Sequence, residues 1–286
     1  GFDCFGLALQ LYLRVTVEER PIDNGWQLSL IGEGSSLLPT DERNLIARVA
    51  YTTATAEKVT LPGLHMLVHN DIPLARGLGS SAAAITAGIA IVEAITGREL
   101  PMEKFFQYAL TFENHADNLA AARCGGFTLA CAAINKNYIA IRQAWPERLH
   151  AIAIIPDFPL DTESARSLLP STYTRADTVF NLQHALLLQA ALAEGDLELI
   201  CEALTDRLHQ PYRATLVPGL SEALTVRLPG LIGVTLSGSG PTLLALATEN
   251  FDTISVTLQD VFAQQGVFAQ AKLLTIDMQG RSIEQR

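Results

Sequence analysis

The chain has 286 residues, of which 49% are hydrophobic and 17% charged, so it can form a packed core, and the composition argues against disorder. Its formal net charge of −10, without any Lys/Arg-rich run, argues against a nucleic-acid partner. No apolar run is long enough to span a bilayer, so we expect no membrane association.

The four cysteines form no CxxC pair and have no histidine at zinc-site spacing. They are typical of reduced, mostly buried thiols, which predicts a cytoplasmic protein. The chain opens at Gly1 without a Met, in what reads as the middle of a loop, and we expect that its N-terminus has been trimmed.

The first half of the chain alternates predicted strands and helices. By periodicity, we expect strands at 7–17, 26–31 and 64–68, helices at 41–56, 80–95 and 102–114, and a hairpin formed by 127–134 and 138–141. Gly97 is expected to end the second helix, and Pro101 to lie in the first turn of the third.

The second half has a different order. A boundary pattern at 145–148 predicts domains at 1–145 and 146–286. Beyond it we expect a strand at 151–155, mainly helix at 161–227, two strands flanking 238–241, a helix at 252–264 and a strand at 267–276. This order is typical of an α+β sheet with helices on one face.

One segment combines glycines and serines between an apolar strand and an alanine-rich helix. Gly77 and Gly79 allow backbone angles closed to other residues, and Ser80 or Ser81 is a good N-cap. The helix start then offers free N–H groups and a positive dipole end to an anion. The segment fits neither the Walker A loop nor the dinucleotide fingerprint. It predicts a phosphate-binding loop consisting of Pro73, Leu74, Ala75, Arg76, Gly77, Leu78, Gly79, Ser80, Ser81, Ala82 and Ala83.

A dense polar string, residues 113–118, ends an otherwise apolar helix. It fits a hydrogen-bonding pocket for a small polar substrate, with Glu113 as a candidate metal ligand. It also fits a plain polar loop with Asx-type turns. The Ser81 hydroxyl is likewise a candidate for contact with Mg²⁺ or phosphate, or for simple capping.

Two arginines are candidates for binding a carboxylate, because a guanidinium matches both carboxylate oxygens. Arg166 lies four residues after Thr162, on the same helix face, although a capping threonine and a solvated arginine fit this spacing too. Arg213 ends the string His-Gln-Pro-Tyr-Arg. The turn Gly238-Ser239-Gly240 fits either a backbone that approaches a ligand or a plain hairpin.

Together these segments resemble the GHMP kinase superfamily. Residues 73–83 match its second motif, 237–241 its third, and 1–9 the tail of its first. The strings at 115–118, 162–166 and 209–213 match homoserine kinases rather than other members. The resemblance covers nearly the whole chain, in order.

The resemblance implies a two-domain α+β fold. It comprises an ATP-binding N-terminal domain like ribosomal protein S5 domain 2, with its first strand missing here, and a ferredoxin-like C-terminal domain. The implied reaction is ATP-dependent phosphorylation of the L-homoserine hydroxyl in threonine biosynthesis, with Mg²⁺ as cofactor; homodimers are common in the family. The alternatives are a GHMP kinase for mevalonate or shikimate, or a non-catalytic ATP-binding relative.

The resemblance also implies residue roles. ATP would contact 73–83 with Gly238, Ser239 and Gly240, and the metal ligands would be Ser81 and Glu113, although Gln107 stands where some members carry a glutamate. The substrate would contact Asp3, His115, Asp117, Asn118, Arg166 and Arg213. Catalysis would involve Asn118, Thr162 and Arg166. Since Asn118 cannot remove a proton, we hypothesise that no side-chain base operates.

Overall fold

A computed structural model describes residues 4–21, 25–134 and 137–284. The chain forms two compact units: unit 1 comprises 1–74, 79–143 and 277–286, and unit 2 comprises 75–78 and 144–276. It passes between them at 74/75, 78/79, 143/144 and 276/277, so two of the passages lie inside the predicted phosphate loop. The predicted domain division at 145/146 stays a prediction, and Asp3 lies outside the described residues.

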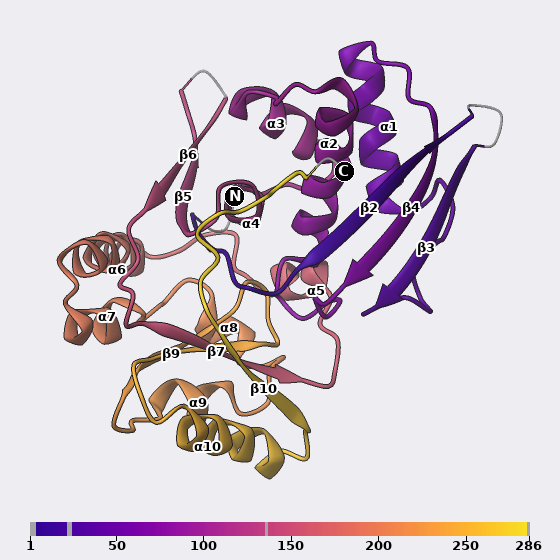
Figure 1. Cartoon of the computed structure of the whole chain (residues 1–286). Coiled ribbons are helices and arrows are strands. Elements are labelled where there is room, and N and C mark those ends of the chain that lie inside the picture. The colour runs from indigo at the N-terminus through magenta and orange to yellow at the C-terminus, as the bar shows by residue number, and fades with distance from the viewer. Residues whose placement is uncertain (1–3, 22–24, 135–136, 285–286) are drawn as a thin grey trace. The chain divides into compact units, whose positions relative to one another are not determined.

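The described strands of unit 1 form two sheets (Figure 1). In one sheet, β5 (Phe127–Ala132) pairs antiparallel with β1 (Phe5–Leu7) and β6 (Tyr138–Gln143). In the other, β4 (Gly63–Asn70) pairs antiparallel with β2 (Leu13–Arg20) and parallel with β3 (Trp26–Gly32).

The single strand predicted at 7–17 was wrong, because the chain changes sheets within it. Leu7 ends β1, which pairs with β5, and Leu13 begins β2, which pairs with β4. The sequence hides such a change, since partly buried hydrophobic residues recur through both strands.

The described helices of unit 1 are α1 (Leu45–Glu57), α2 (Ser80–Thr96), α3 (Met102–Ala109) and α4 (Asp117–Cys124). One apolar cluster joins α1 and α2 to the sheet through Ile46, Ala50, Leu64, Met66 and Ile91. A second joins α2, α3 and α4 through Ile85, Ile89, Phe105, Phe106 and Leu119. The helix that follows the phosphate loop is therefore packed on both sides.

The boundaries of α1, α2 and α3 differ from the predictions in several places. Asn44, not Asp41, begins α1: its Oδ1 accepts from the Ile46 amide at 3.0 Å, as an N-cap does. Gly79, not a serine, is the N-cap of α2, and Gly97 ends α2 as expected. Pro101 is the N-cap of α3, which ends at Ala109. The polar string then leads into α4, a helix that the sequence pattern did not predict.

Unit 2 is built on an antiparallel sheet of order β10-β7-β9-β8. Its strands are β7 (His150–Pro156), β8 (Leu231–Leu236), β9 (Leu243–Ala247) and β10 (Ala269–Leu274). Helices lie between β7 and β8 and again between β9 and β10, which gives the βαββαβ succession of a ferredoxin-like fold. The predicted C-terminal architecture is confirmed.

The described helices of unit 2 are α5 (Thr162–Ser167), α6 (Arg175–Glu194), α7 (Leu197–Ala203), α8 (Gln210–Arg213), α9 (Leu220–Thr225) and α10 (Phe251–Gln264). Figure 1 shows α9 and α10 together on one face of the sheet. The core between them contains Ile152, Leu243, Leu220, Ile254, Leu258 and Phe262.

After β10 the chain returns to unit 1. The Asp277 amide donates to the Ala8 carbonyl at 2.9 Å, and the Gly126 amide donates to the Asp277 carbonyl at 2.6 Å. Gly125 lies against the returning chain, and a Cβ on it would be 2.4 Å from the Gly280 nitrogen. Residues 277–281 are therefore an integral part of unit 1.

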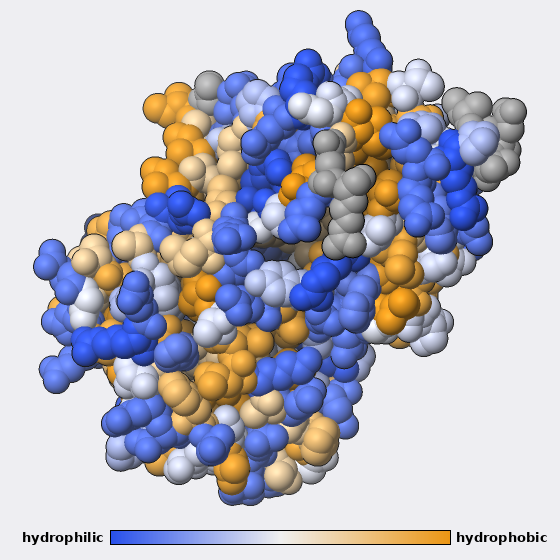
Figure 2. Space-filling model, in the orientation of Figure 1, coloured by the Kyte–Doolittle hydropathy of each residue, from blue (hydrophilic) through white to orange (hydrophobic). Residues whose placement is uncertain are grey.

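The surface in Figure 2 mixes hydrophilic and hydrophobic side chains. The four cysteines, all within the described chain, form no disulfide, but Cys4 and Cys131 are exposed. The expectation of mostly buried thiols was wrong: Cys124 and Cys201 are only partly buried, and Cys131 lies at the exposed end of β5. In the described chain, no helix combines the length and apolar character needed to cross a membrane.

Candidate functional site

The middle of the phosphate loop is anchored in unit 2. Arg76 donates from Nε to the Pro156 carbonyl at 2.8 Å and from Nη2 to the Asp157 carbonyl at 3.0 Å. Its side chain, predicted to contact ATP, therefore also ties the loop to the end of β7.

The turn at 237–241 packs directly against Gly77. Ser237 Oγ donates to the Gly77 carbonyl at 2.8 Å, and a Cβ on Gly77 would lie 2.1 Å from the Ser237 carbonyl oxygen. Gly77 also has a φ of 72°, which L side chains rarely adopt. Two independent constraints thus require glycine here, and the second and third motifs form one surface.

The start of α2 is free to bind an anion. It follows Gly79, whose φ is 74°, and in the described chain no side chain caps its first amides. These N–H groups and the positive end of the helix dipole suit a phosphate. A Cβ on Gly79 would meet Asn118 Cγ at 3.8 Å, so Asn118 lies beside this end of α2.

His115 is held between two carboxylates. Its Nε2 is 2.8 Å from Glu113 Oε1, its Nδ1 is 2.8 Å from Asp117 Oδ1, and all three side chains are at most 13% exposed. Burial would lower the pKa of His115, but the hydrogen bonds to Asp117 and Glu113 outweigh it and raise the pKa to about 9. His115 is therefore protonated at neutral pH and donates from both ring nitrogens.

One carboxylate oxygen of Glu113 takes no part in the contacts with His115. Glu113 Oε2 is buried, and the described chain offers it no hydrogen-bond partner. A buried carboxylate oxygen without a donor is costly unless a cation or water joins it. Glu113 thus fits the predicted role of metal ligand. The described residues contain no ready group of three or more His, Cys, Asp or Glu side chains for a metal ion.

In unit 2 two more residues of the predicted site, Thr162 and Arg213, contact the turn at 238–240, called the glycine turn below. Thr162 Oγ1 and Ser239 Oγ are 3.3 Å apart, and Arg213 Nη1 donates to the Gly238 carbonyl at 2.8 Å. Arg213 is only 3% exposed. Asp161, not Thr162, caps α5 by accepting from the Ser164 amide, which leaves the Thr162 hydroxyl facing the turn.

Arg166 lies in the last turn of α5, one helical turn after Thr162, and is partly buried. Its convergence with Arg213 on one carboxylate stays a prediction.

Comparison with known proteins places this geometry in a family. Residues 44–126 match the family model of the GHMP kinases N terminal domain, and 188–263 match that of the GHMP kinases C terminal domain. The homoserine kinase of Desulfitobacterium hafniense is 40% identical over 99% of this chain and 95% of its own length. That of Aquifex aeolicus is 38% identical over 98% of this chain and 93% of its own. The chain belongs to the GHMP kinase family, among the homoserine kinases.

Solved structures agree with this membership. A homoserine kinase from Cytophaga hutchinsonii superposes on this GHMP kinase with a TM-score of 0.84, at 26% identity, covering 98% of this chain and 91% of that one. A mevalonate kinase from L. major in complex with R-mevalonate superposes with a TM-score of 0.69 at 17% identity, covering 97% of this chain and 89% of that one. At this identity the likeness shows a shared fold alone.

The sequence pattern missed two residues that hold the kinase's Arg213 segment. Asp206 accepts hydrogen bonds from the amides of His209 and Gln210 at the start of α8, and Gln210 Oε1 accepts from the Leu236 amide at 2.9 Å. Asp206 lies three residues before His209, the N-cap of α8, so it falls outside the position where sequence patterns reveal a cap. No local signal marks the contact between Gln210 and Leu236 either.

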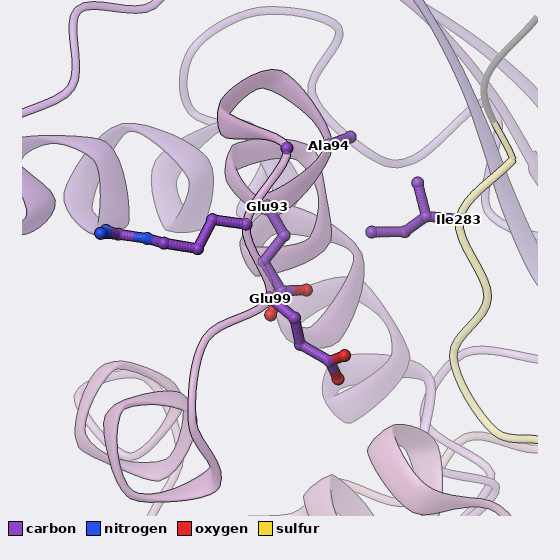
Figure 3. Close-up of a pocket in the computed structure, with 6 residues that line it drawn as sticks. Glu93, Ala94, Glu99 and Ile283 are labelled. Atoms are coloured by element: carbon purple, nitrogen blue, oxygen red, sulfur yellow. The ribbon is translucent and has the colours of Figure 1, made fainter.

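A buried ion pair that ties α4 to α2 was also missed. Arg123 Nη1 lies 2.9 Å from Glu93 Oε2, with the side chains 5% and 1% exposed, and Arg281 Nη2 reaches the same oxygen at 2.8 Å. Figure 3 shows a neighbouring pocket, which Glu93 and Glu99 line together with Ile283. The side chain of Ile283 points toward the end of α2. The volume of the pocket is about 340 Å³. It lies at the far end of α2 from the phosphate loop, roughly 25 Å away along the helix.

Proposed function

We propose that this GHMP kinase transfers the γ-phosphoryl group of ATP to the side-chain hydroxyl of L-homoserine, giving O-phospho-L-homoserine. One observation carries the proposal: the turn at 237–240 packs on the phosphate loop at Gly77 and bonds to both Thr162 and Arg213. A phosphate loop, a hydroxyl and a buried guanidinium on one turn suit an acceptor that carries a carboxylate.

The residue roles follow from charge and hydrogen bonding. Arg213 and Arg166 would bind the substrate carboxylate, and Asp117 with Asp3 its amino group. Thr162 would lie near the reacting hydroxyl. Since His115 uses both ring nitrogens on Glu113 and Asp117, we assign it the role of holding Asp117 in place.

The chemistry requires positioning and charge stabilisation more than a base. The substrate hydroxyl oxygen forms a bond to the γ-phosphorus, the bond from that phosphorus to the β,γ-bridging oxygen breaks, and ADP leaves. Asn118 cannot accept the hydroxyl proton, which would pass to the γ-phosphate or to water. Asn118 lies beside the start of α2, so it can orient the groups that react there.

Mg²⁺ belongs to the proposal through Glu113. Mg²⁺ is usually held by one or two carboxylates together with substrate phosphates, so a protein cage of several ligands is not required. The unpartnered Glu113 Oε2 fits one such ligand, and the Ser81 hydroxyl, freed from capping, would be the other protein group. When bound, the ion supplies neutralisation of phosphate charge.

A homodimer and a cytoplasmic location stay predictions. On α6, the exposed side chains of Val179, Leu182 and Leu186 recur at helical spacing, which leaves apolar surface open to a partner.

The test is ADP release from Mg²⁺-ATP with homoserine, mevalonate, shikimate or no acceptor. We expect turnover that depends on homoserine. Turnover with another acceptor alone, or tight ATP binding with no turnover, would contradict the proposal and favour a different alcohol kinase or a non-catalytic relative. Arg213→Ala should raise the KM for homoserine more than that for ATP.

A further inference from the structure

The carboxylate of Asp206 organises the chain just before α8. Its Oδ1 accepts from the Leu208 amide at 3.0 Å and from Asn181 Nδ2 at 2.6 Å, while its Oδ2 accepts from the amides of His209 and Gln210. The side chain is only 14% exposed. Both oxygens are therefore committed to holding the backbone and to Asn181 on α6.

Asn181 strengthens this arrangement from the other side, because its Oδ1 accepts from the Arg207 amide at 2.8 Å. Asp206 and Asn181 together thus bind the main chain at four successive residues, 207–210. Burial would raise the pKa of Asp206, but the hydrogen bonds from His209, Asn181 and the neighbouring amides outweigh it and hold the pKa well below its usual range.

Helix α8, whose start Asp206 fixes, is too short to be stable on its own. Helix α8 has four residues, and an isolated helix of this length is unstable in water. Gln210 opens α8 and accepts from the Leu236 amide at 2.9 Å, so it sets the helix against the end of β8. Arg213 closes α8 and donates to the Gly238 carbonyl. The orientation of the guanidinium therefore depends on where α8 begins.

We infer that Asp206 is a positioning residue for binding the substrate carboxylate, acting through α8 on Arg213. This inference rests on the proposed function, since it takes Arg213 as the carboxylate ligand. Asp206 does not touch the substrate: its own oxygens are filled by the loop amides and Asn181.

The experiment compares two acceptors, L-homoserine and 3-aminopropanol, which is homoserine without its carboxylate. The measured quantity is kcat/KM for L-homoserine divided by kcat/KM for 3-aminopropanol. Asp206→Ala should lower this ratio about tenfold, because displacement of a positioned group weakens the interaction with the carboxylate alone. Asp206→Asn, which keeps one acceptor oxygen, should restore part of the ratio.

The matched control is Asp196→Ala. Asp196 is the N-cap of α7 in the same unit and accepts from the amides of Glu198 and Leu199. Its loss should cost stability without changing the ratio. Emission of Trp145, in a Trp26→Phe background, reports whether unit 2 is folded in each variant. If Asp206→Ala does not fold, Asp206→Asn and Asn181→Ala serve as the test.

The outcomes separate the inference from the proposed function. If Arg213→Ala lowers the ratio and the folded Asp206 variants do not, the inference is overturned while the function stands. If an Asp206 variant lowers kcat/KM equally for both acceptors, its role is general folding and the inference is again overturned. If Arg213→Ala leaves the ratio unchanged, the carboxylate assignment itself fails.

Discussion

In unit 1 the candidate substrate residues are held by charged side chains, whereas in unit 2 they are held by main-chain hydrogen bonds. His115 is fixed by two carboxylates, and α4 is tied to α2 by the Arg123–Glu93 pair. In contrast, Arg213 donates to a backbone carbonyl, and Asp206, which we propose positions it, accepts from backbone amides. The stability of unit 1 should therefore depend on its buried charges. The activity that depends on unit 2 should be sensitive to any change in the path of its backbone.

The largest effect is expected at the backbone contact between Gly77 and the glycine turn. Gly77→Ala would place a Cβ 2.1 Å from the Ser237 carbonyl oxygen at a φ of 72°. We expect kcat/KM to fall about 1000-fold, equivalent to ~4 kcal/mol. Gly97→Ala is the control: its φ is 62°, but a Cβ there would meet nothing within 4 Å. If both variants lose activity equally, the steric explanation is wrong.

Next in size is the loss of charge in unit 1. Arg123→Ala would leave Glu93 buried with fewer partners, which should cost roughly 3 kcal/mol of unfolding free energy. Urea unfolding followed by Trp26 emission, in a Trp145→Phe background, isolates unit 1. Arg98→Ala removes an arginine that is 64% exposed, and should cost at most about 1 kcal/mol. Equal losses in the two variants would count against the buried pair.

The smallest effect tests charge in unit 2. Because the folded pKa of Asp206 lies below its unfolded value, its ionisation stabilises unit 2 above the unfolded pKa, about 4. This stability is lost as pH falls through the folded pKa. Asp206→Asn should therefore be less stable than the parent by about 1–2 kcal/mol at pH 7. The difference should shrink below about pH 4, as followed by Trp145 in a Trp26→Phe background. A difference independent of pH would contradict the role of the charge.

Local chemistry explains which features were predictable. The positive-φ glycines at 77 and 79 and the end of α2 at Gly97 depend on neighbours in sequence, and the pattern indicated them. The exchange of sheets after Leu7 depends on which strand pairs with which, and no local signal marks it. Arg123 and Glu93 are 30 residues apart, so their pairing required the packed helices.

The serine cap of α2 was wrong for a physical reason. Gly79 in the αL conformation already directs the chain into the helix, so a serine one residue later lies inside the first turn. Its hydroxyl is then free for a ligand rather than for the backbone.

The return of residues 277–281 to unit 1 has a consequence for synthesis of the protein. On the ribosome these residues emerge only after all of 144–276, yet Asp277 completes contacts with Ala8 and Gly126, and Arg281 reaches Glu93. Domains made first usually fold first. Here the unit that begins the chain cannot close its buried charge network until the other unit has left the ribosome, so its nascent form must wait with Glu93 incompletely paired.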